Sequence, residues 1–231
     1  MAVSLGAVRV VSVPAGRVAR WVARLEAEHG TLDVEPAAGR LLLHAADGTS
    51  CELEPVLAPA TLWTPPSDPA RAAAELAAAL VRPQRQAIVL IRRGGYAIAV
   101  MTPDGPTASK VGQRYVQGRT AAGGWSQQRF ARRRENQAAE LVRAVADVAV
   151  RILIGPGTGP KLPCNHLVTG GDRPLLKAVL GDRRLHDIAV LPPGAHLEIG
   201  EPRSALLKEL PERLYAARIT IYPSTTHEVE S

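Results

Sequence analysis

Aromatic side chains are scarce in this chain, with three tryptophans, four tyrosines and one phenylalanine among 231 residues. A hydrophobic core must therefore be built from valine, leucine, isoleucine and alanine, and the length suffices for one sizeable domain plus a small one. Long apolar runs are also lacking, since none approaches the roughly 20 residues of a membrane-spanning helix. We therefore expect no membrane partner, and the N-terminal stretch favours a strand over a signal peptide.

Cysteine is almost absent. The two cysteines, Cys51 and Cys164, lie far apart and in no CxxC spacing. This spacing argues against a disulfide framework and a structural zinc site, and it favours a reducing, cytoplasmic compartment. The six histidines include no pair spaced i,i+4, the spacing at which two imidazoles on one helix share a metal ion. We predict neither a metal site nor a cofactor.

Acidic residues are missing from Gly105 to Arg134, although the whole chain has 22 acidic and 28 basic residues. A net charge of +6 favours polyanions only weakly, because an arginine-rich composition gives the same value. A one-sided stretch is more specific, since solvated helices usually mix both signs, and it favours a phosphate-bearing partner such as nucleic acid. The candidate RNA-binding residues are Lys110, Arg114, Arg119, Arg129, Arg132, Arg133 and Arg134.

The pattern from about Ser126 to Ile154 predicts one long helix. Its apolar residues recur at alternating steps of three and four and so line one face: Ala138, Leu141, Val145, Val148 and Ile152. Arg132 and Arg133 follow Arg129 by three and four residues. At about 100° per residue, these three arginines fall roughly opposite that face. We therefore expect the arginine cluster to point away from the core.

Residues 1–66 are predicted to form a small α+β unit. A β-branched strand comes first, and a helix with an apolar stripe follows and ends at Gly30. The next apolar runs suggest a short strand and a hairpin that turns at Asp47-Gly48.

Residues 67–223 are predicted to form a second, larger domain of the α/β class, a mixed sheet with packed helices. Within it, Asp172 is a plausible cap for a helix that follows a strand. Two strands or strand pieces are expected over 187–200, and a C-terminal helix over 201–219. Residues 224–231 are expected to be a flexible tail.

The stretch GGWSQQRFARRRENQAAELVRAVADVA, residues 123–149, resembles a loop and helix of known proteins. It is similar to the GGQ loop, of the form GGQSxxRFxRxR, and the following helix in the middle domain of eukaryotic and archaeal class-I peptide release factors. The matching positions are Gly123, Gly124, Ser126, Arg129, Phe130, Arg132 and Arg134. The resemblance covers about residues 85–222 and implies a ribonuclease-H-like fold there.

The loop departs from that form at one position. Trp125 stands where the release factors have their catalytic glutamine, and Gln127 and Gln128 follow. This shifted form resembles the Vms-like release factor family of ribosome-quality-control peptidyl-tRNA hydrolases, in its actinobacterial branch. The resemblance places Ser126-Gln127 on the Ser-Gln pair of that family. Gln127 is then the first candidate for the catalytic glutamine, and Gln128 stays open as the alternative.

The resemblance also implies a reaction and its partners. In this family the cleaved bond is the ester between the nascent peptide and the tRNA, so the large ribosomal subunit, its rRNA and peptidyl-tRNA are the expected partners. Gly123 and Gly124 would allow a slim loop to enter a site made of RNA. A glutamine side chain or an adjacent N–H would position the attacking water. Because residues 1–66 carry no decoding signature, we expect codon-independent release; no motif identifies a recruiting protein.

Two other functions stay open on the sequence. A non-catalytic ribosome- or RNA-binding module fits if Trp125 marks the loss of the release glutamine. A tRNA-end nuclease fits a ribonuclease-H-like fold, but such an enzyme normally uses clustered carboxylates and a metal ion. Residues 105–134 contain no carboxylate side chain.

Overall fold

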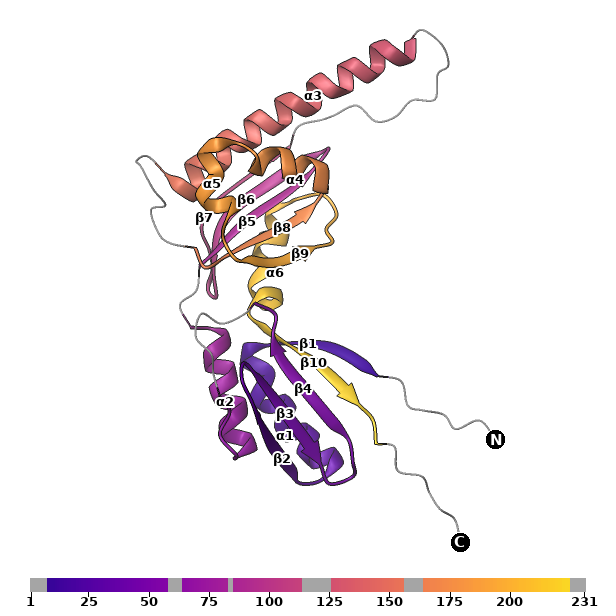
Figure 1. Cartoon of the computed structure of the whole chain (residues 1–231), viewed down its shortest axis with the longest axis vertical. Helices are drawn as coiled ribbons and strands as arrows, with labels where there is room; N and C mark the ends of the chain where they lie inside the picture. Colours follow the sequence, from indigo (N-terminus) through magenta and orange to yellow (C-terminus); the bar gives the residue numbers. More distant parts are fainter. Residues whose placement is uncertain (1–7, 58–63, 83–84, 114–125, 156–163, 225–231) are drawn as a thin grey trace, which may run out of the picture. The chain divides into compact units, whose positions relative to one another are not determined.

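The computed structural model describes residues 8–57, 64–82, 85–113, 126–155 and 164–224. The chain divides into two compact units, one made of residues 1–83 and 212–231 and the other of residues 84–211. Each unit contains one five-stranded sheet with helices packed on it (Figure 1). The mixed α/β class predicted from the sequence is confirmed.

The sheet of the first unit is wholly antiparallel, in the order β1-β10-β4-β3-β2. Its strands are β1 (Arg9–Pro14), β2 (Leu32–Ala37), β3 (Arg40–Ala45), β4 (Ser50–Pro55) and β10 (Ala216–Tyr222). A 3₁₀ turn, η1 (Ala15–Arg17), leads into α1 (Val18–His29), and α2 (Pro69–Leu80) follows β4 in the chain. Both helices contribute to one core with alternate strand residues, of which Leu41 and Leu53 are fully buried.

Local side-chain bonds fix the ends of these elements. The Asp68 carboxylate accepts a hydrogen bond from the Arg71 N–H at 2.7 Å and so caps α2. At the β3–β4 turn, the Asp47 carboxylate accepts the Thr49 N–H at 2.8 Å, and Gly48 adopts a φ of 89°. The hairpin turn predicted at Asp47-Gly48 is confirmed.

The sheet of the second unit is mixed, in the order β7-β6-β5-β8-β9. Its strands are β5 (Gln86–Arg92), β6 (Gly95–Thr102), β7 (Gly105–Gln113), β8 (His166–Gly171) and β9 (Pro193–Leu197). β6 is antiparallel to β5 and β7, whereas β8 is parallel to β5 and β9. β6 alone therefore runs against the other four strands, and helices connect the parallel strands in the chain.

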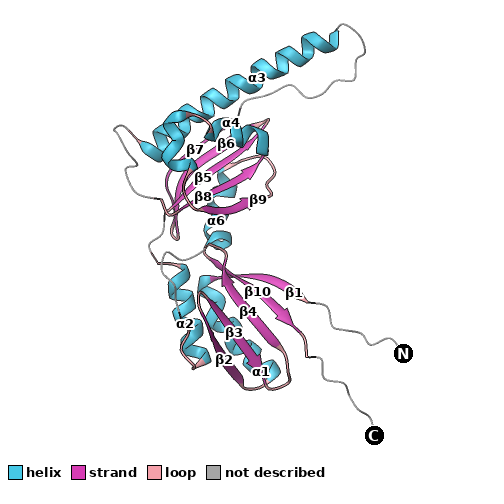
Figure 2. Ribbon diagram, viewed as in Figure 1, coloured by secondary structure: helices cyan, strands magenta, loops and turns pink. Residues whose placement is uncertain are grey.

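The helices of the second unit follow the strands that they connect. They are α3 (Ser126–Ala149) with its π-helical continuation η2 (Val150–Ile154), α4 (Arg173–Leu180), η3 (Arg183–Leu185), α5 (His186–Ala189) and α6 (Ser204–Leu214), within which the division between the units falls. α3 and α4 pack on one face of the sheet and share a core with β5 and β6 (Figure 2). Residues that point to the other face, such as Ile88, Leu90 and Met101, are also fully buried.

The structure divides the chain differently from the expected boundary at residue 66. The helix expected over 201–219 ends at Leu214, and the chain continues as β10 between β1 and β4. α2 and the C-terminal strand thus belong to the first unit, and the second unit does not extend to residue 223. The segment ARITIY, 217–222, alternates apolar and polar residues from Ala217 to Ile221 and is rich in β-branched side chains, and this pattern favours a strand.

A second correction concerns the region over 187–200. We expected two strands or strand pieces there, but residues 187–189 are helical in α5 and β9 is the strand of this region. Ile188 is 2% exposed and packs in the core beneath α3 and α4. A short apolar run fits a buried helical turn as well as a strand, which explains the error.

Candidate functional site

The edge strand β7 ends at Gln113, and α3 begins at Ser126. The residues between them, 114–125, are called the candidate loop. Most β7 residues are exposed, Lys110 among them. Lys110 lies opposite Ile98 of β6, and Ile98 belongs to the core under α3. Because directly opposed residues of an antiparallel pair share a face, Lys110 lies on the helix-covered face of the sheet. This predicted RNA-binding residue therefore shares a face with α3.

A tyrosine packed over a glycine holds the end of β7. Gly112 pairs with Tyr96, and a Cβ atom at residue 112 would lie 2.4 Å from Cζ of the Tyr96 ring. Tyr96 is buried and belongs to the core with α3. Only glycine leaves room for the ring, so this contact fixes the last residues of β7 against β6.

The predicted helix begins at Ser126, as expected from its pattern. Ser126, Gln127 and Gln128 form the first turn of α3. The first backbone N–H groups of a helix have no acceptor within the helix, and the helix dipole adds partial positive charge there. This turn therefore favours negative charge, such as a phosphate or a developing oxyanion.

The other predicted site residues fall into two groups. Arg129, Arg132, Arg133 and Arg134 belong to the turns of α3 that follow, and the structure describes the side chains of α3 from Asn136 onward. The remaining residues, Arg114, Arg119, Gly123 and Gly124, lie outside the described residues. The structure thus places the glutamine pair and the arginine cluster on one continuous helix.

The C-terminal half of α3 anchors the helix. Leu141 and Val145 are fully buried in the core with β5 and β6, and Val148 is nearly so. Asn136 and Glu140 are exposed. The predicted apolar face is confirmed. Figure 2 shows that this half crosses the sheet, whereas the N-terminal part of α3 extends past its end.

Sequence reasoning missed an arginine pair next to the candidate loop. Arg92 and Arg93 are exposed in the β5–β6 turn, and Gly95 pairs there with Gln113, the last residue of β7. Arg93 Nε lies 3.9 Å from a carboxylate oxygen of Asp172. The sequence RRGG, residues 92–95, was the available signal. The pair adds positive charge where the chain leaves β7.

The junction of β8 and α4 packs against the same end of the sheet. The Asp172 carboxylate accepts the Leu175 N–H at 3.2 Å, so the predicted cap is confirmed. The Asp172 N–H donates to the Ile91 carbonyl at 2.8 Å. Gly171 has a φ of 93°, and a Cβ there would lie 2.2 Å from the Ile91 oxygen. This glycine lets α4 begin directly beside the arginine turn.

Side chains that could supply other chemistry are few in the described parts. No group of three or more His, Cys, Asp and Glu side chains there could hold a metal ion. Cys51 and Cys164 are free, and burial raises the pKa of each thiol to about 11. Burial lowers the pKa of His166, whose Nδ1 lies 3.2 Å from Gln86 Oε1. Among the described helices, none has the length and apolar character to cross a membrane.

Comparison with known proteins gives one family. The sequence model of the family described as "Actinobacteria/chloroflexi VLRF1 release factor" matches residues 84–220, which include β7, the candidate loop and α3. A solved structure described as "Vms1 mitochondrial localization core" is similar at 11% sequence identity, with a TM-score of 0.38, over 88% of this chain and 80% of that chain. No curated protein matches. The family resemblance seen in residues 123–149 is confirmed, and the chain belongs to the Actinobacteria/chloroflexi VLRF1 release factor family.

Proposed function

We propose that this chain is a codon-independent peptidyl-tRNA hydrolase that acts on stalled large ribosomal subunits in the cytoplasm. The observation that carries the proposal is the position of Ser126, Gln127 and Gln128 at the start of α3. The far half of this helix is anchored in the core, and its near part extends past the sheet. A single helix that projects from a folded domain is narrow enough to enter a reaction centre enclosed by RNA. Membership of a release factor family supports the same activity.

The proposed step is an ester hydrolysis. A water molecule attacks the ester carbonyl carbon, the bond from that carbon to the ribose oxygen breaks, and the peptide acid and the tRNA hydroxyl leave. Gln127 orients the water, because its amide can accept and donate hydrogen bonds at once. Backbone N–H groups of the first turn of α3 stabilise the developing oxyanion. Gln128 is the alternative residue for the orienting role.

RNA binding is assigned to the basic residues on both sides of the loop. They are Lys110, Arg114, Arg119, Arg129, Arg132, Arg133 and Arg134. Arginine matches phosphate with two parallel donors, and each phosphate contact releases counterions, so binding should weaken steeply with salt. We add Arg92 and Arg93 to this surface, because their turn adjoins the last residue of β7.

The topology of the second unit supports the fold that the resemblance implies. Its first strand in the chain, β5, lies at the centre of the sheet, and β6 alone runs against the other strands. This arrangement fits the ribonuclease-H-like fold of the release-factor middle domain. A fold of this kind supports several activities, so the choice between hydrolase and nuclease depends on the bond that is cleaved.

The cleaved bond can be identified on isolated large subunits that carry peptidyl-tRNA labelled in both parts. In ¹⁸O-labelled water, we expect one ¹⁸O atom in the carboxylate of the released peptide and a full-length tRNA. A peptide that leaves with a nucleotide attached, beside a shortened tRNA, would identify a nuclease. Stable, salt-sensitive binding to the subunit without either product would identify a binding module.

A further inference from the structure

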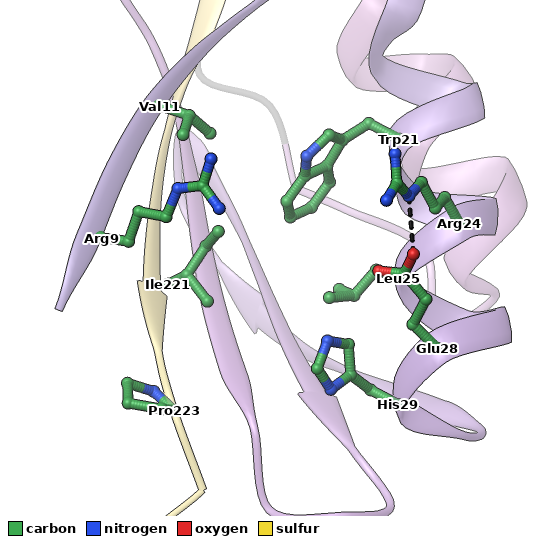
Figure 3. A pocket seen from close by; sticks show the side chains of 9 residues that line it. All are labelled: Arg9, Val11, Trp21, Arg24, Leu25, Glu28, His29, Ile221 and Pro223. Atoms are coloured by element: carbon green, nitrogen blue, oxygen red, sulfur yellow. Dashed lines mark hydrogen bonds and ion pairs between the residues drawn. The ribbon is translucent and has the colours of Figure 1, made fainter. Parts of the chain in front are cut away.

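The first unit contains an open groove between α1 and the β1–β10 edge of its sheet (Figure 3). Its volume is about 400 Å³, which lies in the range of small-ligand sites. α1 contributes Trp21, Leu25 and His29, and the strands contribute Val11 and Ile221. This groove lies in a part of the chain that the proposed hydrolysis does not use.

The apolar walls of the groove fit a flat ring. Trp21, Val11 and Ile221 are only partly buried, and all three pack against the core of the first unit. Figure 3 shows the indole of Trp21 pointing from α1 toward the strands that carry Val11 and Ile221. An indole face stacks on any nucleobase, because every base has a π-face.

The charge at the groove favours an anion. Arg9 is exposed, its guanidinium points into the groove in Figure 3, and it forms no ion pair with another described residue. Arg24 also lines the groove and donates to Glu28 at 2.7 Å. That pair is weak, since the two side chains are 75% and 50% exposed. The lining therefore offers one cation that has no ion pair among the described residues and one that a phosphate can recruit.

Further arginines continue from the groove along α1. Arg20 is exposed on α1, and so is Arg17, the last residue of η1 directly before it. With Arg24 they recur at steps of three and four, so they share the side of the helix next to Trp21. At a rise of about 1.5 Å per residue, neighbours in this row are roughly 5 Å apart along the axis. A row of guanidinium groups beside an aromatic platform matches the alternation of phosphates and bases in a single strand.

We propose that this groove is a binding site for one nucleotide of single-stranded RNA. The base stacks on Trp21 against the wall of Val11 and Ile221, and its phosphate binds Arg9. A peptide with a terminal carboxylate would use Arg9 but would leave the arginine row of α1 without a role. The site stands on the first unit alone and does not depend on release activity.

The test uses the full chain with Trp63→Phe and Trp125→Phe, so that Trp21 is the only tryptophan reporter. Titration with hexauridylate should quench Trp21 fluorescence saturably. Arg9→Gln should weaken this binding. It should also make the fall of log affinity with log salt less steep by about 0.7, the value for one phosphate contact in a single strand. Arg82→Gln removes the same charge from an exposed position of the first unit away from the groove, and it should leave both quantities unchanged.

Three results would overturn the proposal. The first is no quenching by the RNA in a chain whose circular dichroism and thermal unfolding match the unsubstituted protein. The second is quenching that Arg9→Gln and Arg82→Gln reduce equally. The third is quenching by a short peptide with a free C-terminal leucine but not by hexauridylate, which would assign the groove to a peptide. Because the reporter is Trp21, Gln127→Ala should leave all of these signals unchanged even if release fails.

Discussion

Gln127→Ala is expected to slow peptide release from large ribosomal subunits by about 10²-fold, the loss typical of misplacing a reacting group. The substitution leaves the backbone donors of α3 in place and removes the amide that orients water. Alanine is the best helix former, so the loss cannot arise from a weaker first turn. The measurement is the single-turnover rate at saturating protein, where binding no longer limits the reaction.

Matched variants separate the two glutamines. Gln128→Ala should release peptide at nearly the rate of the unsubstituted chain, and so should Gln113→Ala, which removes an exposed amide outside α3. A large loss in Gln128→Ala alone would transfer the orienting role to that residue. Equal rates in all three variants would contradict an amide role in the first turn of α3.

Gly171→Ala is expected to destabilise the second unit by about 3–5 kcal/mol, since it combines backbone strain with overpacking. A Cβ atom there would meet the Ile91 carbonyl oxygen at 2.2 Å, and the φ of 93° is unfavourable for any residue but glycine. The added atom would push the cap of α4 away from the end of β5. The measurement is the shift of the urea midpoint, with the change in slope checked.

Two other glycines of the second unit divide this effect into its parts. Gly105 has a φ of 124° with open space around its Cβ position, so Gly105→Ala should cost only the backbone strain, about 1–2 kcal/mol. Gly200 has open space and no such φ, so Gly200→Ala should change stability by less than about 0.5 kcal/mol. A midpoint for Gly171→Ala equal to that of Gly200→Ala would contradict the close packing of the β8–α4 junction.

Local features of the fold could be predicted from the sequence because their causes act over a few residues. The Asp172 cap, the Asp47-Gly48 turn and the start of α3 each depend on neighbouring side chains or on a helical period. The place of β10 depends instead on pairing with β1 and β4, which are distant in the chain. No local signal says which sheet a strand will join, and the expected end of the second domain at residue 223 was wrong for that reason.

The candidate site also contains features with local causes and features that depend on distant parts of the chain. Its residues from Gly123 to Arg134 were found through a motif, which is a local pattern. Arg92 and Arg93 join the site only because Gly95 pairs with Gln113. The groove of the first unit needs Arg9, Trp21 and Ile221 together, and only the fold brings these residues to one place.

The most direct measurement is peptide release by the unsubstituted protein from isolated large subunits that hold peptidyl-tRNA, without small subunit or messenger RNA. Protein in excess over subunits gives a single-turnover rate, and one gel follows both labels. We predict that the protein releases free peptide far faster than buffer does and leaves the tRNA full length. Peptide that stays ester-linked to tRNA, while the protein sediments with the subunits, would contradict codon-independent hydrolysis.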